Sequence, residues 1–153
     1  MTEKDSTHAN IGAERMAEAL GQIDQQLAEG YAHLAMQRAQ YLALLREVKL
    51  ARAAESDRSW ELADVEQRLR DLAEQREGPG DPLMEREIAY LVGRRTKLEE
   101  EVLAHLLLSD ELVSRARDEE RALAAGEQDW ATRAVSLMAE RDRLDEGRTA
   151  GDG

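Results

Sequence analysis

The chain has 153 residues, of which 33 are acidic and 21 are Lys or Arg, so its formal net charge is −12. It contains no Cys and no Phe, and aromatic residues make up only 3%, which leaves Leu and Ala as the main core material. These features exclude thiolate zinc sites, disulfides and cysteine nucleophiles. The acidic balance argues against binding to nucleic acid or to an anionic membrane.

The remaining composition is typical of long helices. Hydrophobic residues make up 42% and charged residues 35%, the balance found in amphipathic helices and coiled coils. The most apolar stretch, 102–108, is too short to span a bilayer, and the first residues lack the order of a signal peptide. We therefore expect a cytoplasmic, all-helical protein.

The first predicted element is a long helix. Residues 1–10 precede the apolar pattern, and we expect them to be flexible. From about residue 11 to 77, apolar residues recur at steps of three and four, which predicts one apolar seam along a helix. Its members are Met16, Leu20, Ile23, Leu27, Tyr31, Leu34, Tyr41, Leu45, Val48, Leu62, Val65, Leu69 and Leu72.

A single strong break follows at residues 78–82, which hold both prolines. Gly78 suits the position just past a helix end, Pro79 cannot continue that helix, and Gly80 adds a second flexible residue. Asp81 can cap the next helix, and Pro82 suits its first turn. The pattern predicts a turn between two helices.

The second predicted helix covers about residues 82–146, and residues 147–153 are expected to be flexible. Its apolar seam has the same spacing as the first. The seam includes Met84, Ile88, Leu91, Leu98, Val102, Leu112, Ala116, Leu123, Trp130, Leu137 and Leu144.

Two arms of equal length joined by a short turn should pack antiparallel. A turn near residue 80 then requires facing residues to have numbers that add up to about 160, and the seams obey this rule. Leu72 faces Ile88, and Trp130 faces Gly30, a large residue against a small one. We predict an elongated, antiparallel two-helix coiled-coil hairpin.

The middle of the hairpin predicts a protein-interaction surface. Segment 51–59 is poor in large apolar residues, whereas the facing segment 102–108 is rich in leucine, so a two-helix seam cannot bury all of these leucines. We expect a partner to cover them, either a second copy in a homodimer or an amphipathic helix of another protein. The alternative is a wide seam with scattered exposed leucines. The predicted interaction residues are Trp60, Leu106, Leu107, Leu108 and Val113.

The sequence indicates no catalytic or metal site. His8, His33 and His105 are far apart, and the phosphate-binding, hydrolase and metalloprotease motifs are absent. His105 would face Glu55, either in a polar layer that fixes the alignment or as a solvated side chain. Acidic runs spread around a helix and do not converge. We expect no enzyme activity, cofactor, metal or small-molecule substrate.

Segment 87–103 resembles a bacterial family of coiled-coil hairpins that carry a C-terminal C4-type zinc ribbon. The matching residues are Glu87, Ile88, Leu91, Arg94, Leu98, Glu99, Glu101 and Leu103. Segment 20–24 is also similar to the start of that family's first helix. The resemblance implies a non-catalytic adaptor or chaperone-like binder, with transcription or flagellar components as partners in some members. The ribbon's own functions are not implied, because this sequence has no cysteine.

Two other functions remain open from the sequence. Stalk proteins of flagellar and type III export systems are also antiparallel hairpins of similar length, although they tend to be basic and this chain is acidic. A purely structural spacer would need only the hairpin itself and no specific surface.

Overall fold

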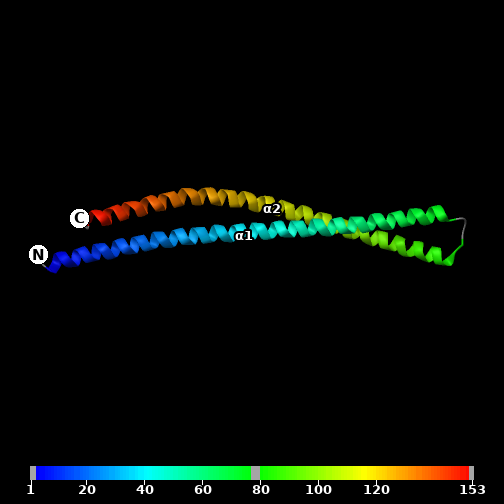
Figure 1. The fold of residues 1–153 in the computed structure, drawn as a ribbon, viewed down its shortest axis with the longest axis horizontal. Coiled ribbons are helices and arrows are strands. Elements are labelled where there is room, and N and C mark those ends of the chain that lie inside the picture. The colour runs from blue at the N-terminus through cyan, green and yellow to red at the C-terminus, as the bar shows by residue number, and fades with distance from the viewer. Residues whose placement is uncertain (1–2, 77–79, 152–153) are drawn as a thin grey trace. The chain divides into compact units, whose positions relative to one another are not determined.

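The computed structural model describes the chain from residue 3 to 76 and from 80 to 151, with side chains between 10 and 148. It contains two helices, α1 (Glu3–Gln75) and α2 (Pro82–Gly151) (Figure 1). No strand occurs among the described residues, and the long helices pack against each other. The predicted all-α helical hairpin is therefore confirmed.

Both helices extend further at the chain ends than the apolar pattern predicts. α1 begins at Glu3 and not near residue 11, and α2 continues to Gly151, beyond residue 146. Segment 3–10 contains no Gly or Pro, and a glycine such as Gly147 weakens a helix by only about 1 kcal/mol. Because nothing at either end stops a helix, backbone hydrogen bonding continues past the seam. The flexibility predicted for these ends stays a prediction.

A capping hydrogen bond defines the start of α2. The backbone N–H of Leu83 donates to Oδ1 of Asp81 at 3.0 Å, and the backbone N–H of Glu85 donates to the Asp81 carbonyl oxygen at 3.0 Å. Pro82, which has no N–H to leave unpaired, occupies the first helical position. Two of the predicted turn residues, Gly78 and Pro79, lie outside the described residues.

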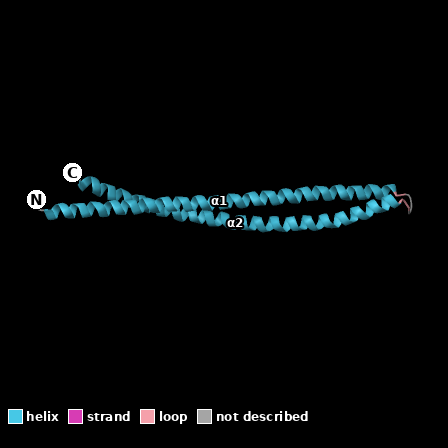
Figure 2. Cartoon of the chain, turned by 90° about the horizontal axis from the view of Figure 1, so that it is seen from below, coloured by secondary structure: helices cyan, strands magenta, loops and turns pink. Residues whose placement is uncertain are grey.

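The helices form two compact units. Unit 1 combines Met1–Gln40 with Glu119–Gly153, and unit 2 is Tyr41–Asp118. Within each unit the two helical segments lie side by side and run in opposite directions (Figure 1, Figure 2). Each unit therefore has its own seam between α1 and α2.

The two seams are narrow and built mainly from aliphatic residues. The buried cluster of unit 1 is Ile23, Leu27, Ala134 and Leu137, with Trp130 and Leu144 packed against it. The cluster of unit 2 is Leu44, Val48, Ala51, Leu112 and Ala116, with Tyr41 and Val113 against it. Leu72 and Leu98, also in unit 2, are the most completely buried large side chains among the described residues.

Two residues assigned to the seam from the sequence are outside it. Tyr31 is 52% exposed and Leu45 is 38% exposed, and the seam positions beside them belong to Gly30 and Leu44. The three- and four-residue apolar spacing predicted these two residues in the seam because each directly follows a true seam position. A seam residue as small as Gly30 carries no apolar signal of its own.

Candidate protein-interaction surface

One lateral side of unit 2 carries ion pairs between the two helices. Arg68 Nε lies 2.9 Å from Glu87 Oε1, and Arg94 pairs with Glu61. Glu61 and Arg68 directly precede Leu62 and Leu69 of the seam, so they share one side of α1. We call this the ion-paired side.

The ion pairs join into a connected group of four side chains. Arg58 Nη1 donates to Glu61 Oε2 at 3.0 Å, and Arg58 Nε lies 3.3 Å from Glu101 Oε2. Arg94 donates to the other oxygen of Glu61. This group, Arg58, Glu61, Arg94 and Glu101, links α1 to α2 through alternating charges, and we call it the charge cluster.

The hydrogen bonds in the charge cluster shift the pKa values of Glu61 and Arg94. The hydrogen bond from Arg94 lowers the pKa of Glu61 below its ordinary value, against a smaller opposing effect of desolvation, and Arg58 lowers it further. The same bond raises the pKa of Arg94, and the hydrogen bond to Glu87 raises the pKa of Arg68. Glu61, Arg68 and Arg94 are therefore charged at neutral pH.

The charge cluster forms a polar layer at other residues than His105 and Glu55, for which the sequence left open a polar layer or a solvated histidine. Both of those side chains are half-buried, but within the described part of the chain no hydrogen bond or ion pair joins them. Arg58 instead takes the polar seam position and reaches Glu101. The signal for this polar layer in the sequence is a charged residue, Arg58, at a seam spacing.

The opposite side of unit 2 carries exposed leucines. Leu103, Leu106 and Leu107 of α2 are 55%, 43% and 61% exposed. At 100° per residue, Leu106 and Leu107 each lie within about 60° of Leu103 around the helix. These three residues form one apolar strip, which we call the leucine face.

Leu108 does not belong to the leucine face. It is 46% exposed, but it lies about 140° around α2 from Leu103, towards the ion-paired side. Val113 is half-buried and packs against the unit 2 cluster. The structure thus places the predicted interaction residues of α2 in three different surroundings. It adds to the leucine face Leu103, which the sequence predicts only as part of the family-like motif.

Trp60, the predicted interaction residue of α1, is 72% exposed. It borders a shallow hollow of about 310 Å³ that is lined by small or polar side chains of the same helix. The other lining residues are Glu55, Ser56, Ser59 and Ala63. The hollow exists because this stretch of α1 has almost no large side chain beside Trp60.

The family-like motif divides into packing and ion-pairing residues. Leu98 is fully buried, Ile88 and Leu91 are half-buried, and Glu99 is exposed. The charged members other than Glu99 all belong to the ion pairs described above. Apart from Glu99 and Leu103, which are exposed, the residues that carry the resemblance therefore hold the two helices of unit 2 together.

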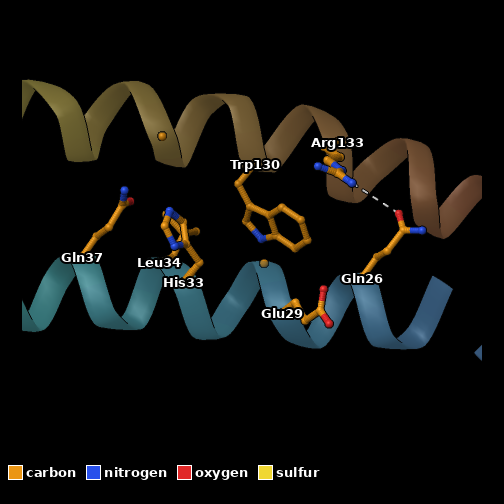
Figure 3. Close-up of a pocket in the computed structure, with 9 residues that line it drawn as sticks. Gln26, Glu29, His33, Leu34, Gln37, Trp130 and Arg133 are labelled. Atoms are coloured by element: carbon orange, nitrogen blue, oxygen red, sulfur yellow. Dashed lines mark hydrogen bonds between the residues drawn. The ribbon is translucent and has the colours of Figure 1, made fainter. Parts of the chain in front are cut away.

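Unit 1 contains a second hollow, of about 300 Å³, beside Trp130 (Figure 3). Trp130 points from α2 towards α1, where its ring lies against Gly30. The ring also meets Tyr31 edge to face at a centroid distance of 5.3 Å. Nε1 of Trp130 and Oε1 of Gln37 are buried without a hydrogen-bond partner among the described atoms. His33, one of the three histidines that lie far apart in the sequence, also lines this hollow.

Polar side chains surround this hollow without converging on one point. Arg133 Nη2 donates to Gln26 Oε1 at 3.4 Å across the two helices (Figure 3), and Arg38 Nε lies 2.9 Å from Glu127 Oε1 in the same unit. The arrangement packs a bulky indole into a two-helix seam, with polar groups around its rim.

Neither a metal site nor a membrane span was found in the part of the chain that the structure describes. No group of three His, Cys, Asp or Glu residues there is placed to hold a metal ion. Neither helix has, within that part, a stretch long and apolar enough to cross a membrane. No family model, curated protein or solved structure matches the chain.

Proposed function

We propose that this chain is a non-enzymatic coiled-coil adaptor that binds a protein partner through the leucine face of unit 2. The observation that carries the proposal is the exposure of Leu103, Leu106 and Leu107 on a protein with 35% charged residues. Adjacent exposed leucines lose unfavourable contact with water when another apolar surface covers them.

The contrast between the two sides of unit 2 supports this proposal. The ion-paired side has charged groups that already have partners within the chain, whereas the leucine face offers apolar area. An amphipathic helix recognises such a strip through apolar residues at helical spacing. A non-catalytic adaptor of this kind is also what the resemblance to zinc-ribbon coiled-coil hairpins implies.

Site-specific photo-crosslinking in the source cells tests the proposal. A photoreactive phenylalanine analogue replaces Leu103 in one variant and Lys97 in the control, because Lys97 is exposed and lies about 120° around α2 from Leu103. We expect a defined protein adduct, identified by mass spectrometry, at position 103 and not at 97. Equal labelling at both positions, or none, would favour the structural spacer.

A further inference from the structure

We infer that the occupant of the leucine face is a second copy of this chain, packed through unit 2 so that α1 of each copy lies over α2 of the other. The inference rests on the proposed function, since it names the partner of the same surface. Three observations support it: the charges that flank the leucines, the position of the hollow beside Trp60, and the direction of the helices.

The first observation is a separation of charge across the leucine side of unit 2. On α1 this side carries Lys49 and Arg52, and on α2 it carries Asp110 between the leucines and Val113. All three charged side chains are exposed, and no ion pair involves them among the described residues. Around Lys49 and Asp110 the α1 edge of the surface is therefore basic and the α2 edge acidic, whereas Arg117, seven residues after Asp110, adds an exposed basic residue further along α2.

A surface with basic residues on α1 and an acidic residue on α2 can be complementary to the same surface of a second copy. A two-fold axis parallel to the helices and lying in the interface puts the α1 edge of one copy over the α2 edge of the other. Lys49 and Asp110 lie at the same level of the hairpin, because their numbers add up to about 160, as for all facing positions. Lys49 of each copy then meets Asp110 of the other.

The second observation is that the hollow lies where the leucines need space. Ser56 and Ser59, which line it, are at the level of Leu103 by the same rule of facing numbers. They also lie on the side of α1 that carries Lys49 and Arg52, since Ser56 follows Lys49 and Ser59 follows Arg52 by seven residues. Leu103 of one copy therefore enters the hollow of the other, a large residue against small ones.

The third observation concerns helix direction. Within unit 2, α1 and α2 are antiparallel (Figure 1), and the same axis makes α1 antiparallel to α2 of the other copy as well. Each helix thus has antiparallel neighbours on two sides, as in a four-helix bundle. A two-fold axis perpendicular to the helices would instead put α1 over α1, and at the level of Lys49 it would put Lys49 near Lys49, which like charges disfavour.

Light scattering during gel filtration of the full chain gives the first test. We expect twice the 17.2 kDa chain mass for the wild type and the monomer mass for Leu103→Glu, with unchanged helicity by circular dichroism. Leu50→Glu is the matched control, because Leu50 is 70% exposed and lies away from the proposed interface; it should stay dimeric. A monomeric wild type at 100 µM, or a dimer unaffected by Leu103→Glu, overturns the inference.

Charge exchange gives the second test. Lys49→Glu should weaken the dimer by about tenfold or more in Kd, because two ion pairs per dimer become repulsions. Lys49→Glu combined with Asp110→Lys should restore the wild-type Kd to within about threefold. Failure of this rescue, with helicity retained, overturns the pairing of Lys49 with Asp110.

Disulfide trapping tests the orientation of the two copies. Because the chain has no native cysteine, only the introduced cysteines can form disulfides. Lys49→Cys and Asp110→Cys variants are mixed and oxidised. We expect the mixed disulfide and little of either homodisulfide; a dominant homodisulfide overturns the proposed axis.

If the chain is monomeric but position 103 crosslinks another protein in cells, this inference fails and the proposed adaptor function stands. If it is monomeric and nothing crosslinks, both fail.

Discussion

Gly30 and Trp130 lie so close across the seam of unit 1 that a Cβ atom on Gly30 would be 2.1 Å from ring carbons of the indole. No Cβ in a folded protein tolerates that distance, so the ring occupies the space that a side chain would take. The contact joins residues that are far apart in the sequence, and it fixes the level at which α1 and α2 meet in that unit.

Gly30→Ala should destabilise the protein by about 1–3 kcal/mol, because the indole must move out of a packed seam. Urea unfolding followed by circular dichroism measures the change. Gly21→Ala is the control: nothing lies within 4 Å of its Cβ position, so it should stabilise the helix by about 0.5–1 kcal/mol. Equal effects of the two substitutions would contradict the close contact.

Leu98→Ala should cost about 2–5 kcal/mol of unfolding free energy, because Leu98 is 0% exposed and its truncation leaves a cavity. The comparison is Leu50→Ala, at a site 70% exposed, which should change stability by no more than about 0.5 kcal/mol. Chemical denaturation of both variants checks this. A small loss in Leu98→Ala would mean that α2 is rotated in the seam relative to the structure.

Asp81→Ala should cost about 0.5–2 kcal/mol, since it removes the side-chain acceptor for the Leu83 N–H at the start of α2. Asp64→Ala serves as the control, because Asp64 is exposed in the interior of α1 and caps nothing. Thermal unfolding should separate the two variants clearly. Asp81→Asn should retain most of the stability, since its side-chain oxygen can accept the same bond.

The charge cluster predicts a pH dependence of stability. The folded-state pKa of Glu61 is lowered from its ordinary 4.5, chiefly by Arg94, so the ionised carboxylate stabilises the fold above that pH. The contribution is lost as the pH falls through the lowered pKa. Glu61→Gln should therefore reduce the Tm at pH 7 and have much less effect at pH 3.

Glu100→Gln provides the reference for this experiment, because Glu100 is exposed and forms no ion pair with the described residues. Its Tm difference from the wild type should be the same at both pH values. A Tm difference for Glu61→Gln that grew as the pH fell would contradict the assigned direction of the pKa shift.

Spacing and turn chemistry were enough to predict the hairpin and the facing of Gly30 and Trp130. Apolar periodicity specifies which helix face is buried, and Gly and Pro mark where helices stop. The same spacing misplaced Tyr31 and Leu45, because a residue next to a seam position differs from it by only 100° around the helix. Apolar spacing therefore predicts accurately how the two helices align along their length. It predicts less accurately how each helix is rotated about its own axis.

The candidate surface was predictable only in part. An excess of leucine over small residues was evident from the sequence, but the side of α2 on which each leucine lies depends on the rotation of the helix. Leu106 and Leu108 are two residues apart in the sequence but lie on different sides of α2. The charge cluster was missed because charged residues near a seam are usually solvated, and only the geometry of Arg58 with Glu61 and Glu101 distinguishes a bonded group.

The charge cluster also limits how the helices of unit 2 can slide. A heptad seam of aliphatic residues repeats itself after seven residues, so a shift of about 10 Å would restore most apolar contacts. The same shift would separate Arg94 from Glu61 and Arg68 from Glu87, leaving partly desolvated charges without partners. These ion pairs therefore give one alignment of the two helices a lower free energy than its shifted alternatives.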